Sequence, residues 1–239
     1  MRIFPVPSQC WAFLQQLRFL QLTLYILFFL FAFPFLGQEW VFKLFSCIFL
    51  LNALLVTLSA SGRIVRLKGL FWLVFAASVI FTALYLLPLF PAERSLFLKL
   101  AITSEILLLL LCLTAILVFI FESREVTVDT IFAAVVAYLI IAVTFAQAYK
   151  ILIYFSPNSF NLTADLAPSG FDMVHGDMIY YSFIVITTVG IGDIVPLTPA
   201  ARMLTAIEGI VGQFFVAVLV AWLVGRFISQ SGHKAPPPE

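Results

Sequence analysis

The stretch Thr187-Thr188-Val189-Gly190-Ile191-Gly192-Asp193 places glycine at alternate positions, directly after the apolar run 178–186. Glycine adopts left-handed backbone dihedrals without a Cβ penalty, so this spacing predicts a backbone of unusual shape. A helix of about ten residues rises only about 15 Å, which is too short to cross the hydrocarbon core of a membrane. We therefore expect the apolar run to enter the membrane and return.

The composition is that of a membrane protein. The chain has 239 residues, of which 63% are hydrophobic and 10% charged, and its mean hydropathy is +1.13. Charged residues make up roughly a quarter of a soluble domain. The formal net charge is +1 and no basic patch is present, which argues against nucleic acid as a partner. Membrane lipid is the expected surrounding.

Six apolar stretches are long enough to span a membrane, because a spanning helix needs about 20 mostly apolar residues. Proline, glycine and charged residues separate them. We expect an all-α integral membrane protein with six transmembrane helices and one re-entrant helix between the fifth and the sixth. The expected spans are 17–36, 40–60, 69–90, 96–121, 128–155 and 201–228.

The distribution of charges predicts how the chain lies in the membrane. Six crossings put both ends on one side, and Arg63, Arg66 and Lys68 form the densest basic loop. Since basic loops stay in the cytoplasm, both termini are expected there. The opposite side then carries residues 156–200, which contain no lysine or arginine. This segment contains four aspartates: Asp165, Asp172, Asp177 and Asp193. Together they would concentrate cations on that side of the membrane. The alternative is that they are ordinary loop residues.

Residues 126–228 resemble the pore module of potassium channels, in the order span, surface loop, re-entrant helix, filter and span. The glycine-containing stretch resembles the selectivity-filter signature T-T-V-G-Y-G-D of that family, with Ile191 in place of the usual tyrosine. Within that family, the chain resembles prokaryotic channels with additional N-terminal spans. The motifs that carry this resemblance are Val126-Thr127-Val128-Asp129, Tyr180-Tyr181-Ser182-Phe183, Thr187 to Pro196 and Glu208-Gly209-Ile210-Val211-Gly212-Gln213.

The resemblance implies that backbone carbonyl oxygens replace the hydration shell of K+, the permeating ion, without any cofactor or resident metal. It also implies that this chain forms a homotetramer with three further copies of itself. Re-entrant backbone must be buried in protein or line water, and a single chain cannot bury it. The implied location is the cell membrane as a multi-pass protein, which in bacteria is the inner membrane. The residues implied to coordinate K+ are Thr188, Val189, Gly190, Ile191 and Gly192, with Tyr180, Tyr181, Thr187 and Asp193 as filter support.

Ile191 is the departure from the family pattern that bears on selectivity. In potassium channels the tyrosine at this position packs against aromatic residues of the pore helix and braces the filter from behind. An isoleucine leaves the backbone carbonyls available but removes the hydroxyl and the aromatic ring. A weakly selective monovalent cation channel is therefore the alternative to a potassium-selective one.

The last expected span contains Glu208, Gly209 and Gly212 within its apolar sequence. Gly209 and Gly212 allow bending or close helix contact, and the resemblance implies that Gly212 lies near the hinge of the pore-lining helix; a packing role is the alternative. An ionisable group inside a span normally faces water or a partner. We expect Glu208 near the cavity or behind the filter, bound to a hydroxyl or an amide such as Gln213, or else bonded between subunits.

Three segments follow from this organisation: four leading spans (1–125), the pore module (126–228) and a short cytoplasmic tail (229–239). The fourth span contains Lys99 as its one basic residue. A voltage-sensing helix needs several basic residues, so steep voltage gating is not expected. The sequence does not reveal the stimulus that opens the pore.

Other classes of function have less support in the sequence. His175 and His233 lie in polar loops without the cluster of cysteine, histidine or carboxylate that zinc or nucleophilic chemistry needs, so no enzyme is expected. A secondary transporter is the alternative from another class, although such proteins usually show two matched broken helices and this chain has one re-entrant segment. A purely structural membrane protein is the last alternative.

Overall fold

The computed structural model describes residues 18–32, 39–60, 68–87, 91–123, 125–161 and 171–232. Within these ranges the chain is helical, apart from short connections and one β-bridge between Phe160 and Pro196. The elements are α2 (Arg18–Ala32), α3 (Glu39–Ala60), α4 (Lys68–Leu86), η3 (Pro91–Glu93), α5 (Arg94–Glu122), α6 (Val128–Phe155), η4 (Pro157–Ser159), α7 (Phe171–Ile186) and α8 (Pro199–Gly232).

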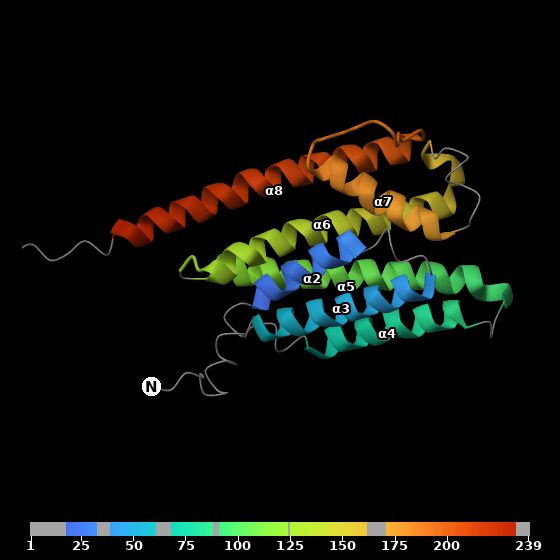
Figure 1. Ribbon diagram of the computed structural model, residues 1–239, viewed down its shortest axis with the longest axis horizontal. Helices are drawn as coiled ribbons and strands as arrows, with labels where there is room; N and C mark the ends of the chain where they lie inside the picture. The colour runs from blue at the N-terminus through green and yellow to red at the C-terminus, as the bar shows by residue number, and fades with distance from the viewer. Residues whose placement is uncertain are drawn as a thin grey trace, which may run out of the picture.

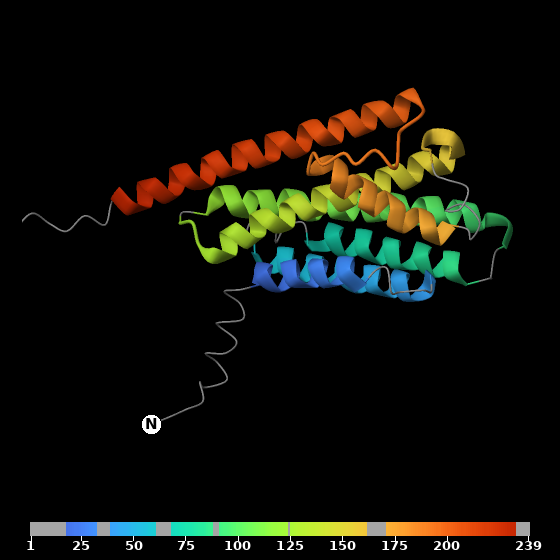
Figure 2. The ribbon, with the colours of Figure 1, turned by 45° about the horizontal axis from the view of Figure 1, so that its top comes forward.

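The long helices run side by side with alternating direction (Figures 1 and 2). The start of α2, the end of α3 and the end of α8 lie at the same end of the bundle, at the left in Figure 1. The much shorter α7 lies between α6 and α8, and the chain after it turns back toward the opposite end (Figure 2). This arrangement fits the expected re-entrant segment between two crossing helices.

Four described helices are long and apolar enough to cross a membrane: Lys68–Leu86, Arg94–Glu122, Val128–Phe155 and Pro199–Ser229. The helices α2 and α3 overlap the first two expected spans, but their apolar parts within the described residues are shorter, Arg18–Phe28 and Ser46–Ser59. The count of six spans therefore stays a prediction. The all-helical, apolar character of the described chain is that of a membrane protein.

The boundaries of α4 and α8 differ from those expected. The helix α4 ends at Leu86 and not at residue 90, because Pro88 disfavours helical backbone at the residue before it. The helix α8 begins at Pro199, where the fixed φ of proline suits a first helical position, and continues to Gly232. The first residues of the expected tail, 229–232, therefore belong to this helix, and the remaining 233–239 lie outside the described residues.

The main hydrophobic core lies between α5, α6 and the N-terminal helices. Its fully buried side chains include Phe19, Leu54, Ile116 and Ile140, one from each of α2, α3, α5 and α6. Burying a side chain of this size contributes about 1.5 to 3 kcal/mol. The four leading helices and the first helix of the expected pore module thus share one core.

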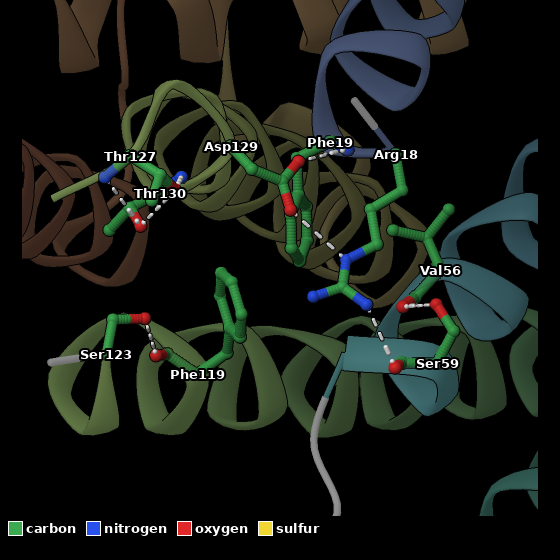
Figure 3. Close-up of polar contacts among 9 residues, drawn as sticks. All are labelled: Arg18, Phe19, Val56, Ser59, Phe119, Ser123, Thr127, Asp129 and Thr130. Atoms are coloured by element: carbon green, nitrogen blue, oxygen red, sulfur yellow. Dashed lines mark hydrogen bonds and ion pairs between the residues drawn. The ribbon is translucent and has the colours of Figure 1, made fainter. Parts of the chain in front are cut away.

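A polar cluster fastens α2 to this core (Figure 3). The Asp129 carboxylate, at the start of α6, accepts hydrogen bonds from the Phe19 backbone N–H at 3.1 Å and from Arg18 Nε at 3.2 Å. The Arg18 guanidinium also donates to the Ser59 carbonyl at 2.9 Å and lies 5.1 Å from the centre of the Phe119 ring. Three other helices are therefore joined to the start of α6 through one ion pair.

The helix α8 buries only one narrow stripe against the rest of the chain. Its buried residues are Ala201, Glu208, Gly212 and Leu219, which recur on one face because seven and eleven residues make nearly two and three full turns. The opposite face exposes large apolar side chains, including Met203, Ile207, Ile210, Phe214 and Val218. That face is suited to lipid or to another protein surface.

Candidate functional site

The helix that precedes the glycine-containing stretch is longer than expected. The helix α7 covers Phe171–Ile186, 16 residues in all, which still corresponds to only about 24 Å. Asp177 lies in the second turn of this helix, and its Oδ2 atom is buried without a hydrogen-bond partner. Burial and the neighbouring Asp193 raise the pKa of Asp177.

The backbone after α7 alternates in handedness. Thr188, Gly190 and Gly192 have φ values of 61°, 55° and 82°, whereas Val189 and Ile191, between them, do not have positive φ. Aligning successive carbonyl groups along one path requires this kind of alternation. The glycines adopt it at no steric cost, but for a β-branched threonine it is unusual. The left-handed conformation of Thr188 extends the pattern that the two glycines predicted.

Hydrogen bonds attach this backbone to the end of α7. The Thr188 N–H donates to the Val185 carbonyl at 2.9 Å, and the N–H groups of Val189 and Gly190 both donate to the Ile184 carbonyl, at 3.0 and 3.1 Å. The carbonyl of Ile186 accepts the hydroxyl of Tyr138, from α6, at 2.8 Å. The stretch is therefore held by its amide groups.

The stretch itself is exposed on this single chain. Every residue from Thr187 to Asp193 is exposed, and Val189 and Ile191 each show 61% of their surface. The N–H and carbonyl groups of irregular backbone are not stable in contact with lipid, because polar backbone groups at membrane depth must be buried in protein or must line water. This chain by itself leaves the backbone of the stretch uncovered.

The two tyrosines expected to support the stretch are held differently. The Tyr180 hydroxyl donates to Asp193 Oδ2 at 2.7 Å, and this bond holds the pKa of Asp193 below its usual value. The Tyr181 ring is buried against Tyr149 and Phe160, and its hydroxyl is 2.8 Å from Thr205 Oγ1 in α8. Tyr180 thus fixes the C-terminal end of the stretch, whereas Tyr181 fixes α7 to α8.

Glu208 lies behind α7 and is fully buried. Its two carboxyl oxygens contact the hydroxyls of Ser182, in α7, and Tyr149, in α6. Ser182 Oγ also lies 2.7 Å from the Ala142 carbonyl of α6. The expected partner Gln213 is exposed, because five residues separate it from Glu208 and place it on another side of the helix. Glu208 therefore joins α6, α7 and α8 within one chain.

The two glycines of α8 have different surroundings. A Cβ atom on Gly212 would lie 2.5 Å from Ile186 Cγ1 and 2.9 Å from the Ile186 carbonyl oxygen, whereas a Cβ on Gly209 would meet nothing within 4 Å. Gly212 therefore allows α8 to approach the last residue of α7 closely. The hinge expected near Gly212 stays a prediction.

Several supporting residues were not singled out from the sequence. Ser182, Tyr149, Thr205 and Tyr138 all donate or accept hydrogen bonds at the ends or the back of α7. Each is a polar group inside an apolar helix, and that signal could have marked them, since such groups need partners. Their pairing could not be found, because it depends on how α6, α7 and α8 pack.

A cluster of metal-binding side chains is not found among the residues that the structure describes. The chain after α7 has instead an exposed backbone whose handedness alternates, with the acidic Asp193 at the end of the stretch. The buried Glu208 lies behind α7. Such a site is suited to contact an ion through main-chain oxygens.

Comparison with known proteins supports a site that contacts ions. Residues 130–229 match a family model described as "Ion channel", and this segment contains most of α6, all of α7, the glycine-containing stretch and most of α8. No curated protein matched the chain, and no solved structure did so either. The match and the long apolar helices support an ion channel in a membrane. They favour neither the transporter alternative nor an enzyme.

Proposed function

We propose that four copies of this chain form a channel through which K+ moves passively down its electrochemical gradient. The observation that carries the proposal is the alternation of positive φ at Thr188, Gly190 and Gly192 at the end of a helix too short to span. Backbone of this kind can present carbonyl oxygens to an ion in place of water. Potassium is the ion that the resemblance of the stretch to potassium-channel filters implies.

The tetramer is proposed because one chain leaves the stretch exposed. Four copies around an axis would bury the outer surfaces of α8 and enclose the exposed residues 187–193 around water. The exposed apolar face of α8 supports this assembly. Native mass spectrometry of the purified protein is expected to give a mass of four chains, and a monomer in several mild detergents would contradict it.

The test of conduction is ion flux into liposomes that contain the purified protein. We expect K+ flux far faster than an alternating-access transporter allows, and a reversal potential that follows the K+ gradient when Na+ is the other cation. Slow flux that saturates with substrate would favour the transporter alternative. Absence of flux for both ions would contradict a channel.

A weakly selective cation channel is the second candidate, and the isoleucine at position 191 favours it. The hydroxyls of Tyr180 and Tyr181 bind Asp193 and Thr205, and position 191 has no hydroxyl with which to bind the pore helix. Equal permeability to K+ and Na+ in the reversal-potential measurement would select this candidate over the potassium-selective one.

A further inference from the structure

The hydrogen bonds around Glu208 determine how many protons this site must hold. Glu208, Ser182 and Tyr149 are all fully buried, so bulk water does not supply the missing donors and acceptors. Three contacts connect them to one another and to α6: Ser182 Oγ to the Ala142 carbonyl, Ser182 Oγ to Glu208 Oε1, and the Tyr149 hydroxyl to Glu208 Oε2. Each contact needs one hydrogen atom to be a hydrogen bond.

The hydroxyl groups supply only two of these three hydrogens. Serine and tyrosine each carry a single O–H, and a carbonyl oxygen or an ionised carboxylate can only accept. If Glu208 were ionised, the Ser182 hydroxyl could donate either to Ala142 or to Glu208, and one contact would join two lone pairs. Two oxygen atoms held 2.7 Å apart with no hydrogen between them repel each other.

The adjacent hydroxyls have no hydrogen to spare. Tyr181 and Thr205 lie 2.8 Å apart, and Thr205 Oγ1 donates to the Ala201 carbonyl at 2.9 Å. With Thr205 donating to Ala201, it accepts from Tyr181, and it also neighbours the Tyr149 hydroxyl, so neither Thr205 nor Tyr181 has a hydrogen left for Glu208. The third hydrogen at Glu208 therefore has to come from the carboxyl group itself.

We propose that Glu208 is a buried proton-binding site, occupied when the glutamate is a neutral carboxylic acid. In this state Glu208 Oε1–H donates to Ser182 Oγ, the Ser182 hydroxyl donates to the Ala142 carbonyl, and the Tyr149 hydroxyl donates to Glu208 Oε2. All three contacts are satisfied, and the group carries no charge. The proton thereby completes the link between α6, α7 and α8.

The groups that face Glu208 from the packed helices suit a neutral acid. Tyr149 and Tyr138, from α6, and Tyr181, from α7, are the titratable groups on its side of the site, and tyrosine is uncharged at neutral pH. Lys150 follows Tyr149 in α6, but it shares a helix face with Gln147, whose amide binds Glu105 of α5 at 2.7 Å. In α8 the nearest basic residue toward its start is Arg202, which is exposed and donates to the Pro196 carbonyl.

Loss of the proton would weaken the hold on α7. The site would then contain a buried negative charge and one contact without a hydrogen, and both are costly away from water. Because α7 ends at the proposed filter, deprotonation is expected to disturb the filter backbone and to reduce conduction. This regulatory step, unlike the proton site itself, rests on the proposed function.

The proton site is tested without any measurement of flux. Infrared difference spectra of the full-length protein at neutral pH should contain the C=O band of a protonated carboxyl that disappears in Glu208→Gln and persists in the control Glu105→Gln, another buried glutamate. Ser182→Ala should shift this band. If Glu208→Gln does not fold, two other measurements serve in its place. The band should disappear from the wild-type spectrum at alkaline pH, and it should shift in Ser182→Ala. A spectrum in which no such band belongs to Glu208 would overturn the proposal.

Thermal unfolding in detergent gives a second readout. A proton bound more tightly by the folded state is lost as pH rises, so the apparent melting temperature of the wild type should fall by about 5 °C from mildly acidic to alkaline pH. Glutamine donates and accepts as the neutral acid does, so Glu208→Gln should lack this component while Glu105→Gln keeps it. An unchanged pH profile in Glu208→Gln would contradict the proposal.

Flux measurements across pH then test the regulatory step. Potassium flux through the wild type, normalised to its maximum, should fall as pH rises, and the normalised flux of Glu208→Gln should not. Flux that is independent of pH in the wild type, together with a clear carboxyl band, would refute the regulation and keep the proton site. Absence of flux at every pH would refute the proposed channel, and the spectra and melting curves would decide the proton site alone.

Discussion

The Tyr180 hydroxyl donates a 2.7 Å hydrogen bond to Asp193 Oδ2, and so joins α7 to the outer end of the glycine-containing stretch. The same carboxylate accepts the Ile194 N–H at 2.9 Å through Oδ1. Both groups are exposed, so the bond lies at the surface of the chain. It is the direct side-chain link between the helix and the residues that follow the proposed filter.

Removing this hydroxyl should change the acid sensitivity of the pore. The bond lowers the pKa of Asp193, so the carboxylate stays ionised, and the bond stays intact, until the pH falls through that lowered pKa. In Tyr180→Phe the pKa of Asp193 should rise toward its ordinary value. Potassium flux on external acidification should then begin to fall at a higher pH than in wild type. Identical acid profiles for the two proteins would contradict a role for this bond.

Gly190→Ala should abolish ion flux. Gly190 has a φ of 55°, where a Cβ atom adds about 1 to 2 kcal/mol of strain, and relief of that strain would turn the carbonyl groups out of line. The matched control is Gly69→Ala in α4, where φ is not positive and a Cβ would meet nothing within 4 Å. Flux assays in liposomes should show loss for the first variant and wild-type rates for the control. Normal flux through Gly190→Ala would count against the filter.

Gly212→Ala should destabilise the protein. The added methyl would lie 2.9 Å from the Ile186 carbonyl oxygen, and overpacking of this kind costs about 1 to 3 kcal/mol. Gly225→Ala is the control, since it lies in the same helix and its Cβ would meet nothing within 4 Å. Melting curves in detergent should show a lower midpoint for Gly212→Ala only. Equal midpoints would mean that α8 does not need this close approach.

Asp129→Asn should loosen α2 from the bundle. The carboxylate accepts from both Arg18 Nε and the Phe19 N–H, and loss of its charge is expected to cost about 2 kcal/mol because hydrogen bonds to charged groups are the stronger ones. Hydrogen exchange should rise in α2 and not in α7. A double-mutant cycle with Arg18→Ala measures the coupling, and purely additive effects would show that the ion pair contributes nothing.

The sequence was sufficient for the features that depend on local chemistry. Apolar stretches of spanning length predicted the long helices α4, α5, α6 and α8, since lipid leaves the backbone few alternatives to a helix. The short apolar run predicted a helix shorter than its neighbours α6 and α8, and α7 has 16 residues; that it enters the membrane and returns stays a prediction. The alternate glycines predicted left-handed backbone at Gly190 and Gly192 because only glycine takes it without strain.

Tertiary structure alone decided which polar groups meet. Glu208 was expected inside a span with a hydroxyl or amide partner, but its contacts with Ser182 and Tyr149 depend on how three helices pack. Gly212 is required because α8 approaches Ile186, a residue distant in sequence. The sequence by itself determines the left-handed backbone at Gly190 and Gly192, because glycine takes it without strain. The packing of α6, α7 and α8 decides what holds that backbone in place, because hydrogen bonds between helices need directions that spacing along one helix does not specify.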